Sequence, residues 1–170
     1  MERKGANIPG KEIKIGVLSD THLHEVTREL KEISKKQLAD IDLILHAGDV
    51  VSREILDFLS KKTFHGVYGN MDPFEIRSAL PRKKIVEVGA YRLGLIHGWG
   101  AASGLEDHIR SEFQGVDAII YGHSHRPVNH VREGVLFFNP GTATGYSSEG
   151  RHTMGILEVG DTIRGEIVPL

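Results

Sequence analysis

Histidine, aspartate and asparagine side chains recur directly after five apolar runs of this 170-residue chain. The segments that contain them are Asp20-Thr-His22, His46-Ala-Gly-Asp49, Gly69-Asn70-Met-Asp72, His97-Gly98 and Gly122-His123-Ser-His125. Carboxylate, amide and imidazole groups bind divalent cations, and a set without thiolate suits Mn, Fe, Ni, Co or Zn better than an all-oxygen calcium site. The pattern therefore predicts a metal centre built from distant segments of the chain.

Two local features explain how these side chains could share one cavity. Residues two apart in an extended chain point to the same side, so Asp20 and His22 can face one ion. The pair His123 and His125 has the same spacing. A neighbouring glycine lets the backbone turn sharply and frees the side chain beside it to enter a cavity. Glycines of this kind stand beside Asp49, Asn70, His97 and His123.

The apolar runs before these segments are predicted to be β-strands. They cover residues Ile13–Leu18, Leu43–Leu45, Phe64–Tyr68, Arg92–Ile96 and Val116–Tyr121. Further strands are predicted at Ile85–Val88, Val128–Val131, Val135–Phe138, Thr153–Val159 and Ile163–Val168. Ligands of open α/β sheets collect beyond the carboxyl ends of the strands, so five strand ends would deliver donor groups to one edge.

Amphipathic stretches between the early strands predict helices. One covers Val26–Leu38, another begins at Ser52, and a short helical or irregular piece lies between Pro73 and Pro81. The run Ser103-Gly-Leu-Glu106 has the form of a capping box before a further helix. Because strands and helices alternate in the first half, we predict parallel pairing there and antiparallel pairing in the later, strand-rich part. Periodicity alone thus gives a mixed α/β domain.

Composition restricts the classes of protein that remain. Lys and Arg total 21 against 23 Asp and Glu, and this formal net charge of −2 argues against binding nucleic acid or membrane surfaces by overall charge. The absence of cysteine excludes a disulfide scaffold, a thiolate metal site and a cysteine nucleophile. No apolar run approaches the roughly 20 residues needed to cross a bilayer. We expect residues 1–12 to be a flexible polar arm without a signal peptide, residues 13–170 to be one domain, and the location to be cytoplasmic.

The five motifs, taken together and in this order, resemble those of the calcineurin-like metallophosphoesterase superfamily. The resemblance covers about residues 13–169, and in size the chain is most similar to the compact bacterial and archaeal phosphodiesterase branch. Asn139-Pro-Gly-Thr142 also looks like the Asn-Pro-Gly turn of that branch. The resemblance implies a four-layer α/β (α+β) sandwich, in which two mixed β-sheets are flanked by helices.

The resemblance also implies roles for individual residues. Asp20, His22 and His125 would hold a first divalent ion, Asn70, His97 and His123 a second, and Asp49 would bridge both. The expected ions are Mn²⁺ or Ni²⁺, with Fe, Co and Zn as alternatives, about 3.5–4 Å apart. The implied activity is hydrolysis of small phosphodiesters by in-line attack of a metal-bridging hydroxide. As a catalytic residue, Asn70 would bind metal through its oxygen while its NH₂ group reaches a phosphate oxygen.

Position 71 departs from the pattern of the family. Many relatives have histidine where Met71 stands, and methionine cannot donate a proton. We therefore expect leaving groups of low pKa, such as aryl esters, to be favoured. His24 and His46 are candidates for a replacement acid by proximity in sequence only, and Asp72 is expected to lose its customary role as the partner of that histidine.

Two other functions are compatible with the sequence. A eukaryotic retromer subunit shares the implied fold and serves as an assembly scaffold, so the fold does not guarantee catalysis. The superfamily also includes DNA-repair nucleases, but this chain has no obvious basic or aromatic track, and we expect Trp99 to be a packing residue. All seven ligand positions are occupied by competent groups, which favours an enzyme. The expected partner is a small phosphodiester substrate, without a membrane or a strong nucleic-acid signal, and oligomerisation is left open.

Overall fold

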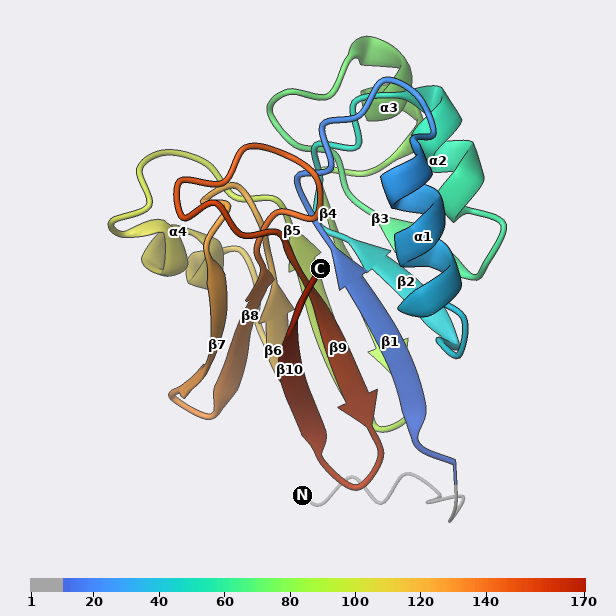
Figure 1. Cartoon of the computed structure of the whole chain (residues 1–170). Coiled ribbons are helices and arrows are strands. Elements are labelled where there is room, and N and C mark those ends of the chain that lie inside the picture. Colours follow the sequence, from blue (N-terminus) through green and yellow to red (C-terminus); the bar gives the residue numbers. More distant parts are fainter. Residues whose placement is uncertain (1–10) are drawn as a thin grey trace.

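The computed structural model of the protein describes residues 11–170, which form two mixed five-stranded β-sheets (Figure 1). The first sheet has the strand order β10-β9-β1-β2-β3. Its strands are β1 (Ile13–Leu18), β2 (Leu43–His46), β3 (Phe64–Gly66), β9 (Thr153–Val159) and β10 (Ile163–Pro169). The second sheet has the order β4-β5-β6-β8-β7. Its strands are β4 (Lys83–Val88), β5 (Tyr91–Ile96), β6 (Ala118–Ile120), β7 (Pro127–Arg132) and β8 (Val135–Pro140).

Four helices cover the outer faces of the sheets. They are α1 (Arg28–Lys36), α2 (Arg53–Leu59), α3 (Phe74–Ala79) and α4 (Leu105–Ser111). The first two helices have side-chain N-caps. The Thr27 side chain accepts a hydrogen bond from the Leu30 N–H before α1, and the Ser52 side chain accepts one from the Glu54 N–H before α2. In Figure 1, α1, α2 and α3 lie beside the first sheet and α4 beside the second.

The capping box predicted at Ser103 is wrong. Gly104, which has no side chain to cap with, precedes α4 and has a φ angle of 81°. The carboxylate of Glu106 instead accepts hydrogen bonds from the Tyr121 hydroxyl at 2.7 Å and from His130 Nε2 at 2.9 Å. Glu106 therefore ties α4 to the sheet beneath it rather than closing the end of the helix.

Strand pairing agrees with the prediction in the first sheet and differs from it in the second. β1, β2 and β3 pair in parallel, and the hairpins β4–β5, β7–β8 and β9–β10 are antiparallel. However, β5–β6 and β6–β8 are parallel although they lie in the strand-rich half. The first of these follows from α4, because parallel neighbours need a crossover connection and α4 provides one between β5 and β6.

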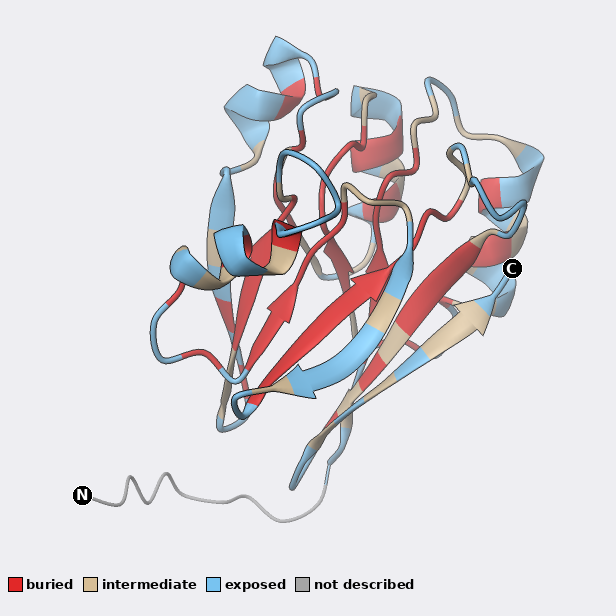
Figure 2. Cartoon of the chain, turned by 90° about the vertical axis from the view of Figure 1, so that its left-hand side faces the viewer, coloured by how far each residue is buried: buried red, intermediate tan, exposed pale blue. Residues whose placement is uncertain are grey.

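The core is divided into three apolar clusters that separate four layers. One cluster lies between the two sheets and includes Ile15, Leu95 and Phe138. The others join the first sheet to its helices through residues such as Leu30, and the second sheet to α4 through residues such as Ile109. Figure 2 shows buried residues along most strands and exposed residues on the helices and edge strands. The predicted four-layer α/β sandwich is confirmed.

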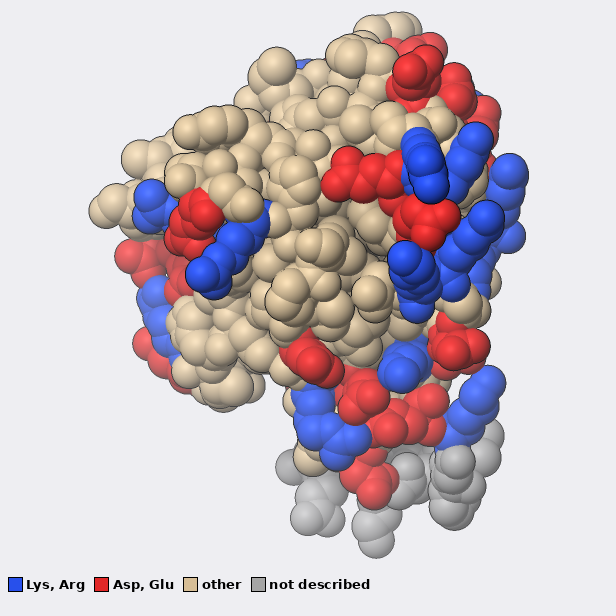
Figure 3. All heavy atoms as spheres, viewed as in Figure 1, with Lys and Arg blue, Asp and Glu red and all other residues tan. Residues whose placement is uncertain are grey.

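Residues 1–10 of the predicted polar arm lie outside the described part of the chain. At the start of the described part, Lys11 Nζ lies 3.2 Å from Asp42 Oδ1. On the face shown in Figure 3, Lys and Arg side chains gather over α1 together with Asp and Glu side chains. Between residues 11 and 170, no helix combines the length and the apolarity that a membrane crossing requires.

Candidate metal centre

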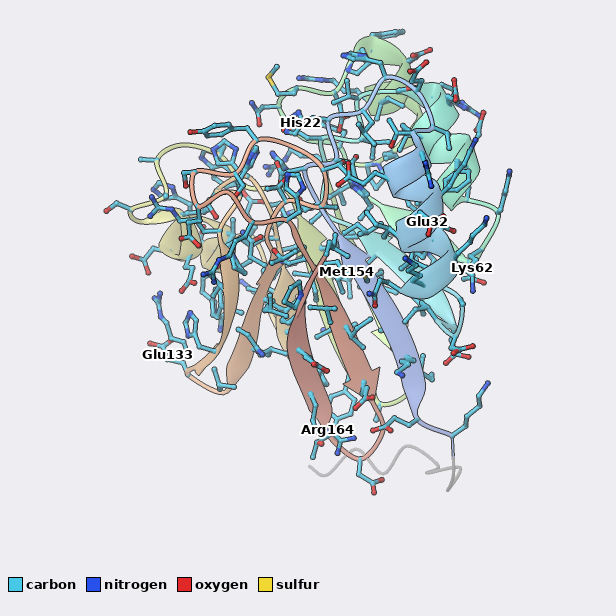
Figure 4. The ribbon with its side chains drawn as sticks, in the orientation of Figure 1. His22, Glu32, Lys62, Glu133, Met154 and Arg164 are labelled. Atoms are coloured by element: carbon cyan, nitrogen blue, oxygen red, sulfur yellow. The ribbon has the colours of Figure 1, made fainter. Side chains whose placement is uncertain are left out.

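The loops that follow β1, β2, β3, β5 and β6 meet at one end of the two sheets (Figure 1). Figure 4 shows His22 at this end, whereas Arg164 and Glu133 lie toward the opposite end. The structure brings the seven predicted ligands together there. They follow strands of both sheets, whereas the strand ends were predicted to meet at one edge. The first sheet supplies Asp20, His22, Asp49 and Asn70, and the second supplies His97, His123 and His125.

Asp20, Asp49 and His97 form a group that we call the deep set, because each is at most 2% exposed. His97 Nε2 lies 3.4 Å from Asp49 Oδ2 and 3.9 Å from Asp20 Oδ1. One ligand atom from each of the three residues lies within 4.8 Å of the other two. The deep set therefore has the spacing of groups that share one ion.

Asp20 also belongs to a second group with His22 and His125, which we call the open set. His125 Nε2 lies 3.1 Å from Asp20 Oδ1, and His22 Nε2 lies 3.6 Å from the same oxygen. The side chains of the two histidines are 23% and 24% exposed. These three residues are the trio that the family resemblance assigns to the first ion.

Asn70 and His123 adjoin the deep set. Asn70 Oδ1 lies 3.0 Å from His97 Nε2 and 3.2 Å from His123 Nδ1. Asp49 Oδ2 lies 3.4 Å from Nε2 of both His22 and His97. One oxygen of this carboxylate therefore faces a histidine of the open set and a histidine of the deep set. This is the position that a bridging carboxylate would occupy, although the buried Asp20 also faces both sides.

Backbone carbonyls fix the orientation of three of the histidines. His97 Nδ1 lies 2.7 Å from the carbonyl oxygen of Ala47, and His123 Nε2 lies 2.8 Å from another backbone carbonyl. His125 Nδ1 lies 2.5 Å from the carbonyl oxygen of Tyr146. A carbonyl oxygen can only accept, so each of these nitrogens carries a proton, and in the neutral ring the other nitrogen offers its lone pair to the site.

The polar atoms of the site fit a divalent cation. Asp20 Oδ1 and His22 Nε2 are buried and have no hydrogen-bond partner among residues 11–170. When the rings are neutral, Asn70 Oδ1 also faces lone pairs of His97 and His123, which repel it unless a cation lies between them. Buried polar groups without partners are costly, and a metal ion would satisfy these atoms together.

Five of the seven candidate ligands have a left-handed backbone conformation. The φ angles lie between 47° and 69° at Asp20, His22, Asp49, His123 and His125. Non-glycine residues are uncommon in this region, and such strain concentrates at functional sites. The spacing of Asp20 and His22, and of His123 and His125, predicted an extended chain at these motifs. That prediction is wrong, because the backbone turns at each of these residues. His123 and His125 accordingly face different groups, Asn70 for the first and Asp20 for the second.

Neighbouring glycines provide the room that the carboxylates occupy. A Cβ atom at Gly69 would lie 2.2 Å from Asp49 Oδ1. A Cβ atom at Gly122 would lie 1.9 Å from Ser19 Oγ and 2.7 Å from Asp20 Oδ2. At Gly69 and Gly122 the glycine is thus needed for close approach to a carboxylate, whereas Gly48 and Gly98 have the positive φ angles, 102° and 100°, of the predicted sharp turn.

The carboxylates and histidines of the site shift each other's pKa values. Burial opposes ionisation of Asp20, but the neighbouring His125 and His22 outweigh it and hold the pKa of this carboxyl well below its ordinary value. The pKa of Asp49 is also lowered, because its contact with His97 outweighs burial. Asp20 in turn raises the pKa of His125 to about 9. The site is therefore rich in ionised carboxylate, which favours a cation.

Asp72 has a structural role that the sequence argument missed. Its carboxylate is buried and accepts hydrogen bonds from the backbone N–H groups of Asp49, Val51 and Gly69 at 2.9, 2.6 and 2.7 Å. Burial raises its pKa despite these bonds. Asp72 thus shapes the loop that carries Asp49, whether or not residue 71 is histidine. Met71 itself is 60% exposed, at the edge of the site.

His46 does not suit the role of a replacement acid. It is completely buried, its Nδ1 accepts from the Gly48 N–H at 3.1 Å, and its Nε2 lies 3.3 Å from Thr21 Oγ1. Burial lowers the pKa of His46 to about 4, so the ring is neutral at neutral pH. It supports the loops around Asp49 instead. His24 is exposed, and within residues 11–170 its side chain makes no hydrogen bond to the site.

The turn at Asn139–Thr142 also supports the site. Thr142 Oγ1 donates to the backbone carbonyl of Asp20 at 2.8 Å, and Asn139 Nδ2 donates to that of Gly122 at 3.0 Å. Thr144 Oγ1 donates to the carbonyl of Thr21 at 2.6 Å. The Asn-Pro-Gly pattern in the sequence was the available signal for this role, but it did not indicate which residues the turn would hold.

Comparisons with known proteins agree with this geometry. The sequence family described as the calcineurin-like phosphoesterase superfamily domain matches residues 13–162. A probable metallophosphoesterase of Methanocaldococcus jannaschii is 35% identical over 167 residues, which cover 96% of this chain and 84% of that protein. A solved archaeal phosphodiesterase is 29% identical with a TM-score of 0.72, covering 93% of this chain and all of that one (100%). Vacuolar protein sorting 29 of Cryptosporidium parvum, at 21% identity and a TM-score of 0.72, covers 94% of this chain and 98% of its own, and shows the same fold.

Proposed function

The chain belongs to the calcineurin-like phosphoesterase superfamily, and we propose on this premise that it hydrolyses small phosphodiesters with two divalent metal ions. Family membership implies a metal-dependent phosphoesterase. The preference for diesters and the number of ions are our proposal. The likeness to the archaeal phosphodiesterase supports the choice of diesters.

The observation that carries the proposal is the pair of buried, unpartnered atoms at the meeting point of the two sets. Asp20 Oδ1 and His22 Nε2 lie 3.6 Å apart and have no hydrogen-bond partner among residues 11–170 when the rings are neutral, because His125 Nε2, 3.1 Å from Asp20 Oδ1, then also presents a lone pair. Asp20, His22 and His125 would hold one ion, and Asn70, His97 and His123 the other. Asp49 would contact both. Imidazole, amide and carboxylate donors suit Mn²⁺ or Ni²⁺, which we expect to be the most effective ions.

When bound, two divalent ions would stabilise charge on the phosphoryl oxygens and supply hydroxide at neutral pH. The chain itself contributes two carboxylates, Asp20 and Asp49, so that the loaded site remains positive and attracts a phosphate anion. Asn70 turns its oxygen toward His97 and His123, which leaves its NH₂ group to donate to a phosphate oxygen.

The hydroxyl groups near the site support attack without a covalent enzyme intermediate. Ser19 is buried and donates its hydroxyl to Asp20 Oδ2 at 2.5 Å, so it is not available as a nucleophile. Ser124 accepts a hydrogen bond from Asn139 Nδ2 at 3.1 Å and has no base beside it in the described chain. Because Met71 offers no proton, the enzyme would favour leaving groups that depart as stable anions.

A comparison of aryl esters tests this function. Protein stripped with a chelator should lose hydrolysis of bis(p-nitrophenyl) phosphate, and added Mn²⁺ or Ni²⁺ should restore it. The diester should be cleaved faster than p-nitrophenyl phosphate, because no additional cation or acid serves the dianionic monoester. Full activity in protein shown by metal analysis to be metal-free, or a clear preference for the monoester, would contradict the proposal.

No observation favours the scaffold or the nuclease as a second candidate. The likeness to vacuolar protein sorting 29 concerns the fold alone. Trp99 stacks on His108 with ring centroids 5.9 Å apart, and the Arg82 guanidinium lies 5.5 Å from its ring centroid. Although Trp99 is 39% exposed, neighbouring side chains already contact its ring, which favours packing over a platform for bases.

A further inference from the structure

A cavity of about 410 Å³ opens beside the candidate metal centre, on the side of His125. Residues 147–153, the start of β7 and the end of β10 form its walls. None of the seven candidate ligands except His125 lines it. The cavity is therefore adjacent to the site but separate from the groups that would hold the ions.

His125 is the wall that the cavity and the metal centre share. Its Nε2 atom lies 3.1 Å from Asp20 Oδ1, inside the centre. Its Nδ1 atom contacts the carbonyl oxygen of Tyr146, at the start of the segment that encloses the cavity. A phosphate held at the metal centre would thus lie about one imidazole ring away from the cavity, which places a substituent of that phosphate within reach of it.

The cavity is lined by both apolar and polar side chains. Pro127, Ile167 and Pro169 supply apolar surface. The polar groups come from Ser147, Glu149, Arg151 and His152. The exposed Arg151 side chain forms no ion pair within residues 11–170, so its guanidinium is available to a ligand. A guanidinium group can both stack on a planar ring and donate hydrogen bonds to its edge.

His152 is held by the protein and serves to position the segment. Its Nε2 atom lies 3.0 Å from the carbonyl oxygen of Gly145, and its Nδ1 atom lies 3.5 Å from the carboxylate of Glu29 on α1. These contacts anchor the end of the segment that carries Arg151. Arg151 is therefore the side chain of the cavity lining that is both cationic and free to meet a ligand.

We propose that the cavity binds a nucleoside, as the organic group that stays on the phosphate when a phosphodiester is cleaved. This proposal rests on the proposed function. Ligand cavities span about 300–1,000 Å³, so this one is suited to a single nucleoside rather than a polymer. A nucleoside offers an apolar ring face to Pro127 and Ile167 and polar edges to Arg151. A plain alkyl group offers Arg151 neither a planar ring nor a hydrogen-bond acceptor.

Two esters with the same leaving group test the proposal. In metal-loaded protein, thymidine 5′-(p-nitrophenyl phosphate) should have a kcat/KM at least about tenfold above that of methyl p-nitrophenyl phosphate, because only the retained group differs. Arg151→Ala should remove most of this advantage through KM and leave the methyl ester unchanged. Arg164→Ala, the same change at the opposite end of the molecule (Figure 4), should alter neither ester.

Equal kcat/KM values for the two esters in the wild-type protein, or an equal loss for both in Arg151→Ala, would overturn the nucleoside subsite. Failure to cleave either ester with Mn²⁺ or Ni²⁺ would overturn the proposed function instead. In that case calorimetry decides about the cavity. Thymidine 5′-monophosphate should bind about tenfold tighter than inorganic phosphate, and Arg151→Ala should abolish the difference. Equal affinities would overturn the subsite.

Discussion

The deep set and the open set share Asp20 but differ in how far they are buried and in what supports them. Asp49 and His97 are at most 2% exposed, whereas the side chains of His22 and His125 are about a quarter exposed, at 24% and 23%. The deep residues lie on loops at the end of the sheets and are covered by the protein, whereas the open histidines are partly exposed to solvent. Changes in the deep set should therefore affect chemistry that metal supply cannot restore, and changes in the open set should mainly weaken metal binding.

The supporting contacts show the same contrast. Asp49 is held by backbone groups, since its N–H donates to Asp72 and its Oδ1 accepts from the Met71 N–H at 2.8 Å. His125 is held by the carbonyl of Tyr146, in a segment without regular secondary structure. Asp49 is therefore held by the loop that follows β3, whereas His125 depends on the separate segment that precedes β9.

The largest effect is expected for Asp49→Asn. The amide keeps an oxygen for the Met71 N–H but loses the charge that faces both sets, so kcat/KM for bis(p-nitrophenyl) phosphate should fall by about 100- to 1,000-fold or more. Excess metal should not restore it. The matched control is Asp57→Asn on the exposed surface of α2, which should keep full activity. A folded Asp49→Asn protein with two ions and normal turnover would contradict the bridging role.

A smaller effect is expected for His125→Ala in the open set. Affinity for Mn²⁺ should fall by at least about 10- to 100-fold, which is the cost of losing only an outer partner of a ligand, and saturating metal should recover much of the turnover. Calorimetric titration with Mn²⁺ measures the first change and steady-state kinetics the second. His130→Ala on β7, which removes an exposed histidine paired with Glu106, is the control. If saturating metal failed to rescue His125→Ala, the contrast between the two sets would disappear.

Met71→His should change selectivity rather than overall activity. Residue 71 is 60% exposed at the edge of the site, so a histidine there could protonate a departing alkoxide. The rate on an alkyl diester should rise by about tenfold relative to an aryl diester, which is less than an optimised general acid provides. The ratio of the two rates is the quantity to measure. An unchanged ratio would show that the missing acid does not limit this enzyme.

The smallest effect is expected in the stability of the metal-free protein. Because burial lowers the pKa of His46 to about 4 from 6.5, the folded state binds this proton less readily than the unfolded state. The resulting stability is complete above pH 6.5 and is lost as the pH falls toward 4, by roughly 3 kcal/mol from these values. His46→Asn should lack this dependence. Denaturant unfolding of both proteins at pH 7 and pH 4.5 tests this prediction. If the free energy of unfolding fell equally in the wild type and in His46→Asn, the pH dependence could not be assigned to His46.

Much of the site could be predicted from the sequence because each motif follows an apolar run. Strands such as Ile13–Leu18 and Thr153–Val159 have the predicted bounds, since alternating or continuous apolar residues mark a buried strand well. The convergence of Asp20, Asp49 and His97 follows from strand ends meeting at one edge. That these strand ends belong to two sheets came only from the resemblance, because periodicity does not specify how sheets pack.

The local geometry could not be predicted in this way. Nothing in the sequence near Asp20 or His125 indicates a φ angle above 50°, because such conformations depend on contacts made by the rest of the fold. The role of Asp72 was missed because it depends on three backbone N–H groups that come together only in the folded loop. The capping box at Ser103 was wrong because Glu106 has better partners in Tyr121 and His130.

The central claim is that the two sets, together with Asn70 and His123, hold a pair of divalent ions, and anomalous scattering from a crystal of the Mn²⁺-loaded protein tests it most directly. The account predicts two peaks about 3.5–4 Å apart, one beside His22 and His125 and the other beside His97 and His123, with Asp49 in contact with both. A single peak, or ions held by residues other than the seven candidate ligands, would contradict it.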